Sequence, residues 1–436
     1  MNDLEYQNIE SHHQVVPFLE LKNLKVISAL GRGAKGVVFL VRSDTDDDEC
    51  FALKTVLKKS IEKSSGRKKT KKSPDRETYA NNNGRQNRLS FEEDVLASLN
   101  HPLFPKLRGL VETDQIIGYA IDYCPGRDLN TLRKKQTEKM FSDDIIRFYA
   151  AEIVMALEYL HGMGIVYRDL KPENVMIQEN GHLMFVDFDL STKLSIRSPD
   201  IRRSAESSPE SPNVNNGRTN KNNKKNKFSP LSFICKSGII TEADSVHPVE
   251  FNSDTSSHQD WDSVEKSNSF VGTEEYLAPE VISGNGHDFA VDWWCLGVML
   301  YEMLYGTTPF RGIDRKETYY RVLVKTPELV GEPTPLRDLI RKLLEKDPKK
   351  RISVEEIKRH EFFKNVDWDH LLEISRPPFI PPVEDLPGIK QIDVESFVHE
   401  IFQGDEHHHD DVKMKDKLDS EANNNNNNKG VWVEGF

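Results

Sequence analysis

Residues 167–174 read Tyr-Arg-Asp-Leu-Lys-Pro-Glu-Asn, and Asp187 follows further along in the string Val-Asp-Phe-Asp. The carboxylate of Asp169 can accept a proton from a hydroxyl group, and the ammonium group of Lys171 can lie against a phosphate. Asn174 and Asp187 carry the amide and carboxylate oxygens that magnesium prefers. Each residue alone would be ordinary, but the four at this spacing predict a loop that supports phosphoryl transfer.

A glycine-rich stretch at 31–36 lies between two strand-like runs, 24–30 and 37–41. Because a second strand and not a helix follows the glycines, they predict a hairpin whose backbone N–H groups can lie over phosphates. Lys54 comes next in Phe-Ala-Leu-Lys, on a third predicted strand from which its ammonium group could reach those phosphates. Taken alone, the glycine-rich stretch could be an ordinary β-turn. Taken alone, Lys54 could be a solvated lysine on an edge strand.

Residues 88–99 have the apolar periodicity of a helix, with acidic side chains between the apolar positions. Glu92, counted back from Val95 and Leu96, is the predicted carboxylate partner of Lys54, and Glu93 is the second choice. A solvated helix face is the alternative for either acid.

The chain resembles eukaryotic protein kinases from about residue 24 to residue 363. Residues 272–280 match the end of an activation segment, and residues 292–297 match the buried helix that anchors the catalytic loop. Arg351 corresponds to the cation that pairs with Glu280 in this family. The resemblance implies an α+β, bilobal fold: a small lobe of antiparallel strands with one helix, a large helical lobe, and long disordered inserts.

Five features narrow the resemblance. Tyr167 replaces the usual histidine, and with the Asp-Trp-Trp run and the His-Glu-Phe-Phe string that ends at Phe363 it resembles the AGC group. Asp189 replaces the glycine of Asp-Phe-Gly, and a long insert follows it. These two departures together resemble the plant AGC group VIII serine/threonine kinases, near the oxidative-signal-inducible branch.

The resemblance implies that ATP binds between the lobes, beside a hinge at 122–124 with Ile121 as gatekeeper. The residues expected to surround the nucleotide or to orient its phosphates are Leu30, Gly31, Gly33, Gly36, Val38, Ala52, Lys54, Glu92, Asp122, Cys124, Asp128 and Met176. An apolar column that aligns the active state would be formed by Leu96, Leu107, Tyr167 and Phe188, which could equally be ordinary core.

The catalytic residues are expected to be Asp169, Lys171 and Thr273. Asp169 would accept the proton of the attacking hydroxyl, Lys171 would steady the phosphoryl group, and Thr273 would contact both. Asn174 and Asp187 would hold Mg²⁺. The threonine fits serine and threonine substrates better than tyrosine.

Arg168, directly before Asp169, implies control by a phosphate on the activation segment. Ser269 is the expected acceptor and Ser267 the alternative. A phosphoserine at either position would give Arg168 a charge-assisted hydrogen-bond partner and order the loop.

Asp128, Glu173 and Glu302 match acidic positions that in related kinases receive arginines N-terminal to the acceptor, and Asp128 would also reach the ribose. The chain is therefore expected to be an intracellular signalling kinase that phosphorylates Ser/Thr in a basic context and is activated by activation-loop phosphorylation. A scaffold without catalysis is the rival from another class, favoured by the side chain of Asp189. A small-molecule kinase is a weaker alternative.

Composition limits where the protein acts. The 436 residues carry a formal net charge of -12, are 37% hydrophobic and include no apolar stretch of the ~20 residues that a membrane span needs. The N-terminus lacks the pattern of a secretory signal, and the four cysteines show no paired spacing, so a cytoplasmic location is expected, with the nucleus and the plasma-membrane periphery as alternatives. The negative net charge argues against a specific nucleic-acid partner.

The chain divides into an N-terminal extension at 1–23, a kinase domain at 24–363 and an AGC-type tail at 364–436. The domain carries a basic and polar insert at 58–87 and an activation-segment insert at 191–266. A solvated loop is one interpretation of each insert. Contact with an anionic membrane surface is the other for both, and nuclear import is a further one for the first.

The tail contains three further signals. Pro377–Pro382 suits an extended strap across the lobes. His407–His409 could bind a metal, although a solvated run is the preferred interpretation. The apolar end at 430–436 is expected to dock on the small lobe or to recruit a phosphoinositide-dependent kinase, but Val433 stands where the family has its first aromatic residue.

Overall fold

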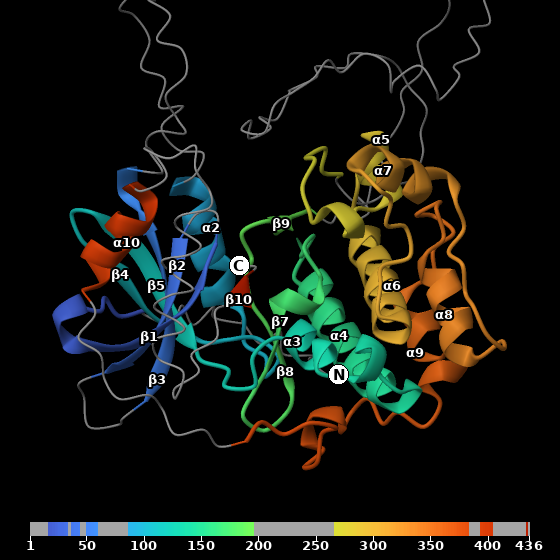
Figure 1. Cartoon of the computed structure of the whole chain (residues 1–436), viewed down its shortest axis with the longest axis horizontal. Helices are drawn as coiled ribbons and strands as arrows, with labels where there is room; N and C mark the ends of the chain where they lie inside the picture. Colours follow the sequence, from blue (N-terminus) through green and yellow to red (C-terminus); the bar gives the residue numbers. More distant parts are fainter. Residues whose placement is uncertain are drawn as a thin grey trace, which may run out of the picture. The chain divides into compact units, whose positions relative to one another are not determined.

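The small lobe of the computed structural model is a six-stranded sheet in the order β10-β1-β2-β3-β5-β4 (Figure 1). The structure describes residues 16–33, 36–43, 49–59, 86–195, 266–382, 393–403 and 433–434. The strands of this sheet are β1 (Leu24–Arg32), β2 (Gly36–Ser43), β3 (Cys50–Leu57), β4 (Leu107–Glu112), β5 (Ile116–Asp122) and β10 (Val433–Glu434). Strands β1 to β5 pair antiparallel, and β10 is parallel to β1.

The predicted glycine-rich hairpin is present between β1 and β2. Gly31 pairs with Val38, and Arg32 pairs with Val37. A Cβ atom on Gly36 would lie 2.3 Å from the carbonyl oxygen of Thr55 on β3, so only glycine fits there. The expected helix is α2 (Gln86–Ser98), which lies between β3 and β4.

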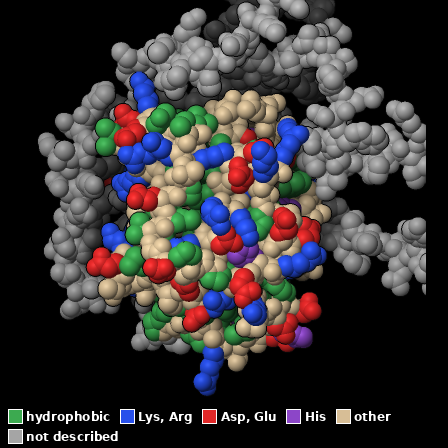
Figure 2. All heavy atoms as spheres, turned by 90° about the vertical axis from the view of Figure 1, so that its right-hand side faces the viewer, with side chains coloured by type: hydrophobic (Ala, Val, Ile, Leu, Met, Phe, Trp, Pro, Cys, Tyr) green, Lys and Arg blue, Asp and Glu red, His purple; other side chains and the backbone are tan. Residues whose placement is uncertain are grey.

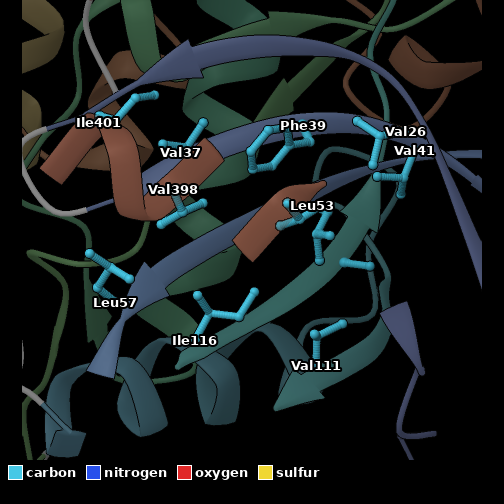
Figure 3. Close-up of a cluster of buried hydrophobic side chains, with 12 residues drawn as sticks. Val26, Val37, Phe39, Val41, Leu53, Leu57, Val111, Ile116, Val398 and Ile401 are labelled. Carbon is cyan, nitrogen blue, oxygen red and sulfur yellow. The ribbon is translucent and has the colours of Figure 1, made fainter. Parts of the chain in front are cut away.

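One face of this sheet is covered by α10 (Val394–Gln403), a helix from the tail (Figures 1 and 3). The apolar cluster at this contact comprises Val26, Val37, Phe39, Val41, Leu53, Leu57, Val111, Ile116, Ala120, Val394, Val398 and Ile401. The ring of Phe397 packs edge-on against Phe39, with 5.5 Å between ring centroids. Sequence reasoning missed α10, although Val394, Phe397, Val398 and Ile401 recur at helical spacing.

The large lobe is helical, as expected. Its helices are α3 (Leu129–Lys134), α4 (Asp143–Gly162), α5 (Pro279–Ser283), α6 (Ala290–Tyr305), α7 (Arg315–Val324), α8 (Pro335–Leu343) and α9 (Val354–Lys358). Short strands carry the catalytic segments: β6 (Ile165–Val166), β7 (Val175–Ile177), β8 (Leu183–Phe185) and β9 (Thr192–Lys193). Helix α6 is buried on almost every side, which makes it a rigid support for the loop that packs on it.

The outer surface of the large lobe mixes both signs of charge. On the face shown in Figure 2, basic and acidic side chains lie interspersed. On α8, for example, Asp338 pairs with both Arg341 and Lys342. Among the coloured residues of this view we find no extended surface of one charge.

The proline-rich part of the tail contacts the large lobe and the hinge region, which fits the predicted strap. A Cβ atom on Gly181, in the turn between β7 and β8, would lie 2.4 Å from the carbonyl oxygen of Phe379. A Cβ atom on Gly126, just after the hinge, would lie 2.7 Å from Pro381. The strap therefore runs so close to the backbone at both points that a side chain there would displace it.

Some of the sequence predictions concern parts of the chain outside the described residues. They are the roles of most of the two inserts, the His407–His409 run, and the aromatic residues Trp432 and Phe436. Among the described residues, none of the helices combines the length and apolar character that crossing a membrane requires.

Candidate active site

The catalytic loop is held by a buried aspartate on α6. The carboxylate of Asp292 accepts hydrogen bonds from the backbone N–H groups of Tyr167 and Arg168, at 2.9 and 2.8 Å. It also lies 2.8 Å from Nε2 of His161. Arg168 has a φ of 70°, in the left-handed region that non-glycine residues rarely adopt, so these bonds stabilise a strained backbone next to Asp169.

Asp169, Lys171 and Thr273 form a closed triangle of hydrogen bonds. Lys171 donates to Asp169 at 2.9 Å and to the hydroxyl of Thr273 at 3.0 Å, and that hydroxyl donates to Asp169 at 2.8 Å. The structure thus brings together the three residues predicted to be catalytic, although more than 100 residues separate Thr273 from the loop. Asp169 is 7% exposed, so its carboxylate is largely shielded from water.

Asn174 offers a buried amide oxygen that no other described residue contacts through a hydrogen bond. Its amide nitrogen donates to the backbone and to the side-chain oxygen of Asp169, at 3.0 and 2.8 Å. Its Oδ1 atom is buried and has no partner among the described residues. A buried amide oxygen without a donor is costly, and a cation would satisfy it. The residues present therefore fit the Mg²⁺ expected at Asn174 and Asp187.

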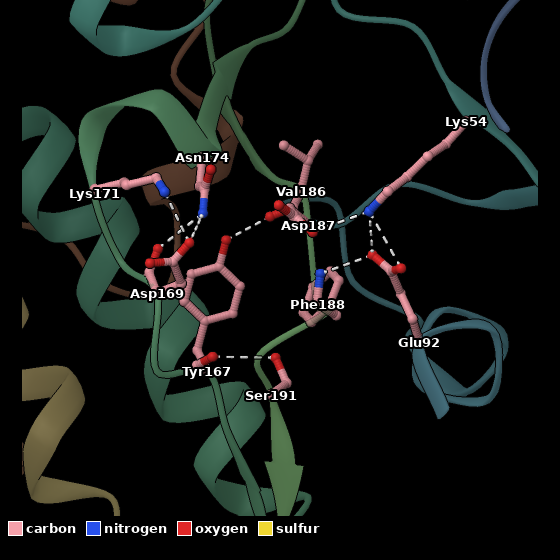
Figure 4. A network of polar contacts seen from close by, with 10 residues as sticks. All are labelled: Lys54, Glu92, Tyr167, Asp169, Lys171, Asn174, Val186, Asp187, Phe188 and Ser191. Carbon is pink, nitrogen blue, oxygen red and sulfur yellow. Dashed lines mark hydrogen bonds and ion pairs between the residues drawn. The ribbon is translucent and has the colours of Figure 1, made fainter. Parts of the chain in front are cut away.

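Lys54 joins the two lobes through two carboxylates (Figure 4). Its Nζ atom lies 3.0 Å from Glu92 on α2 and 3.0 Å from Asp187 in the large lobe. Burial alone would lower the pKa of Lys54, but Asp187 and Glu92 outweigh it and raise that pKa well above its usual value. Glu92, and not Glu93, is the carboxylate on Lys54. Burial and neighbouring acids raise the pKa of Glu93 to about 7.

The aromatic side chains behind this ion pair hold Asp187 in place. The rings of Tyr167 and Phe188 meet edge-to-face with 5.4 Å between centroids, and the Tyr167 hydroxyl donates to the carbonyl of Val186 (Figure 4). The N–H of Phe188 donates to Glu92 at 3.1 Å. Asp187 itself has a φ of 62°. Leu96 and Leu107, the other predicted members of the column, are buried.

The residues expected around the nucleotide lie on the sheet and the hinge. Strand register sets Val38 opposite Lys54, and Ala52 opposite the gatekeeper Ile121. The N–H of Gly33 donates to the carbonyl of Gly36 at 2.9 Å, which closes the hairpin. The remaining expected residues of this stretch, Leu30 and Gly31, lie at the end of β1.

The hinge residues have structural partners of their own. Asp122 accepts from the N–H of Lys106 at 3.0 Å and pairs with Arg108 at 2.5 Å. Cys124 is buried, and its thiol lies 3.4 Å from the sulfur of Met184. Met176 forms an isolated β-bridge with Asp128, which joins β7 to the segment that follows the hinge.

Of the three acids predicted to receive substrate arginines, Glu173 and Glu302 belong to one polar network, and in the described chain Asp128 lies outside its hydrogen bonds. Asp128 is 1% exposed and caps α3, where it accepts from Thr131. The network that joins the other two acids begins at Glu173, which accepts from Asn130 at 2.7 Å. Arg133 then donates to Asn130 and to Glu302, at 2.8 and 2.7 Å.

The activation segment reaches Arg168. Nη1 of Arg168 donates to the hydroxyls of Ser269 and Ser267, at 2.5 and 3.0 Å. Its other nitrogens donate to the carbonyls of Leu190 and Ser191. The same guanidinium thus bonds both ends of the activation segment.

The predicted ion pair below the segment is also present. Arg351 donates to both oxygens of Glu280, at 2.8 and 3.1 Å, and both side chains are almost fully buried. Arg351 also donates to the carbonyls of Ala290 and Glu345. Such a two-point contact fixes the end of the activation segment against α6.

This fold and this arrangement of loop, lysine and carboxylates define a protein kinase. Residues 24–210 and 253–363 match the family model described as protein kinase domain, and the chain belongs to that family. Within it, the chain is one of the plant AGC group VIII serine/threonine kinases. It is 55% identical over 435 residues to serine/threonine-protein kinase OXI1 of Arabidopsis thaliana, covering 96% of this chain and 94% of the relative.

Two other Arabidopsis relatives are similar over most of their length. Serine/threonine-protein kinase UCN is 44% identical over 380 residues, covering 84% of this chain and 86% of the relative. Serine/threonine-protein kinase UCNL is 43% identical over 380 residues, covering 84% and 85%. The protein is accordingly an ATP-dependent serine/threonine protein kinase, and the scaffold and small-molecule interpretations are not supported.

Proposed function

We propose that this kinase transfers the γ-phosphoryl group of ATP to serine or threonine in a basic sequence context, and that phosphorylation of Ser269 activates it. Ser267 is the alternative acceptor. One observation carries the proposal: the hydrogen-bonded triangle of Asp169, Lys171 and Thr273 adjoins an arginine whose guanidinium bonds both serines.

The chemistry follows from the positions of the side chains. The carboxylate of Asp169, oriented by Thr273 and Lys171, accepts the proton of the substrate hydroxyl. Lys171 then lies beside the acceptor and can stabilise negative charge on the phosphoryl group. Lys54, held by Glu92, orients the phosphates of ATP from the small lobe.

We assign the metal to the oxygens of Asn174 and Asp187, because Oδ1 of Asn174 is buried without a partner in the described chain. Mg²⁺ bound there would neutralise charge on the phosphates. Asp187 would have to divide its carboxylate between the metal and Lys54, which it contacts through Oδ1.

The basic substrate preference is supported by the polar network of the large lobe. Glu173 and Glu302 are joined through Asn130 and Arg133, which keeps the two carboxylates near each other and close to the catalytic loop. Burial, and then the negative charges of Glu302 and Asp128, raise the pKa of Glu173. An arginine of the substrate would relieve that repulsion.

Transfer of labelled phosphate from ATP with Mg²⁺ to a basic serine peptide tests the catalytic assignment. We expect Asp169→Asn to lower the rate by about 100-fold or more, the range for loss of a general base. Equal incorporation by the two proteins would contradict the proposal.

The peptide preference needs separate variants. With Glu173→Gln and Glu302→Gln combined, the rate advantage of an arginine-containing peptide over its alanine counterpart should disappear. The rate on the alanine peptide serves as the control and should remain. An unchanged peptide profile would refute the basic-context assignment.

We also propose an upstream phosphoinositide-dependent kinase that recognises the apolar end of the tail, and contact of the basic inserts with anionic membranes. The location proposed is the cytoplasm, with the nucleus and the membrane periphery as alternatives. Pull-down of such a kinase by the full chain, but not by one lacking 430–436, together with imaging of a fluorescent fusion, would test these assignments.

A further inference from the structure

A buried histidine that takes no part in phosphoryl transfer lies beside the activation segment. His287 is 3% exposed and lines a small cavity together with Arg168, Gly272, Thr273 and Cys295. Its Nε2 atom is buried and has no hydrogen-bond partner in the part of the chain that the structure describes. A buried polar atom without a hydrogen-bond partner is unfavourable, so a ligand or an oppositely charged group that bonds it would stabilise the site.

The backbone places His287 next to the proposed phosphorylation site. Its N–H donates to the carbonyl of Ser267 at 2.8 Å, and the N–H of Ser267 donates back at 2.9 Å. The hydroxyl of Ser267 lies 2.9 Å from that of Ser269 and 3.0 Å from Nη1 of Arg168. Ser267 thus connects the backbone of His287 to the side chains of Ser269 and Arg168.

The charges around His287 keep its ring neutral. Burial and then the positive charge of Arg168 lower its pKa to about 4. Three acids oppose this shift with smaller effects: Glu280 from α5, Asp292 from α6 and Asp288 from the preceding loop. The neutral state of His287 therefore depends partly on a cation that an anion could neutralise.

We propose that His287 is a second cationic partner of an activation-segment phosphate, neutral when Ser269 carries a hydroxyl and protonated when it carries a phosphate. This inference rests on the proposed phosphorylation of Ser269. A phosphoserine carries about -1.5 to -2 charges near pH 7. At Ser269 it would neutralise Arg168, attract a proton from solvent to the imidazole and give Nε2 an N–H group to donate.

The inference makes the phosphorylated segment sensitive to pH. Because the phosphate raises the proton affinity of His287, the contact is complete below the raised pKa and weakens as the pH rises through it. The hydroxyl form has no such contact to lose. His287 would thus be a positioning residue that acts on the active site through the activation segment.

Nuclear magnetic resonance of the full chain tests this directly. Two proteins labelled at histidine would be titrated, one with serine and one with genetically encoded phosphoserine at position 269, and a His287→Gln variant would assign the signal. We expect the titration midpoint of His287 near pH 4 in the serine form and at least ten-fold higher proton affinity in the phosphoserine form. His370, which is exposed and pairs with Asp367 in the tail, is the internal control and should not move.

A midpoint of His287 that stays constant or falls on phosphorylation would overturn the inference. The kinase activity of the same two proteins would also be measured. This measurement distinguishes failure of the inference from failure of the proposed function. If phosphoserine raises activity but leaves the midpoint of His287 unchanged, only the inference fails. If the midpoint rises without a gain in activity, the inference holds and activation by Ser269 fails.

A pH profile provides a second measurement. In the phosphoserine protein, His287→Gln keeps a hydrogen-bonding side chain but removes the titration. As the pH rises and His287 loses its proton, the rate of peptide phosphorylation by the parent phosphoserine protein should fall. We expect the substitution to abolish this part of the fall. An identical profile for the phosphoserine protein with and without the His287→Gln substitution would contradict the assigned role.

Discussion

At the scale of single residues, each reactive side chain of the site is held by a partner from a distant part of the chain. Asp169 is oriented by Thr273, and Lys54 by Glu92. The motifs predicted these partners because their residue types and order suffice to specify them. His287 could not be predicted, because its burial depends on a two-residue backbone bridge to Ser267 that no local pattern indicates.

The protonation of His287 predicts an acid sensitivity of the unphosphorylated protein. Its folded-state pKa of about 4 lies below the usual value of 6.5, so between these pH values the unfolded chain binds a proton that the folded chain excludes. The free energy of unfolding should therefore fall with decreasing pH across this window, by up to about 3 kcal/mol from this group.

Urea unfolding at a series of pH values measures this effect. In the His287→Gln variant, which has no group to titrate at this position, the decline between pH 6.5 and about pH 4 should be smaller than in the parent protein. Parallel curves for the two proteins would show that His287 is protonated equally in the folded and unfolded states.

At the scale of elements, α10 shows what pattern reasoning leaves out. Its apolar residues have helical spacing, but the surface that they cover is formed by strands more than 270 residues earlier. The sequence of the tail does not indicate which surface this helix covers. Strands β1 to β3 were predictable from their apolar runs and glycines. The pairing of helix with sheet needed the structure, since it depends on which face of β1 to β3 remains open.

Packing of α10 predicts a measurable loss of stability. Val398 is fully buried in the cluster, so Val398→Ala should lower the free energy of unfolding by about 2 kcal/mol through lost burial and a residual cavity. Glu400→Gln, on the exposed side of the same helix, is the matched control and should change it by less than about 0.5 kcal/mol. Equal effects of the two substitutions on thermal unfolding would argue against the observed packing.

At the scale of the whole molecule, one tail contacts both lobes. Its proline-rich strap lies against Gly181 in the large lobe and Gly126 at the hinge, and α10 then packs on the small lobe. The sequence indicated the strap through its prolines. The close contacts of the strap with Gly181 and Gly126 could not be predicted. They depend on glycines elsewhere in the chain, and the proline-rich sequence does not indicate which residues it contacts.

Truncation before α10 should separate the effects on the two lobes. A chain ending at residue 391 lacks the cover of the sheet, so backbone amides of β2 and β3 should exchange with deuterium faster than in the full chain. Helices α4 and α6, which α10 does not cover, should keep their protection. Uniformly faster exchange in both lobes would mean that the tail supports the fold in some other way.

The position of α10 along the chain also has a consequence for biosynthesis. Strands β1 to β3, which it covers, are complete at Leu57, but the ribosome adds Val394 only 394 − 57 = 337 residues later. At about 5–20 residues per second, the nascent strands would wait for roughly 17–67 s with an apolar face uncovered. Chaperones that hold nascent chains would therefore be expected to determine the yield of this kinase more than its final stability does.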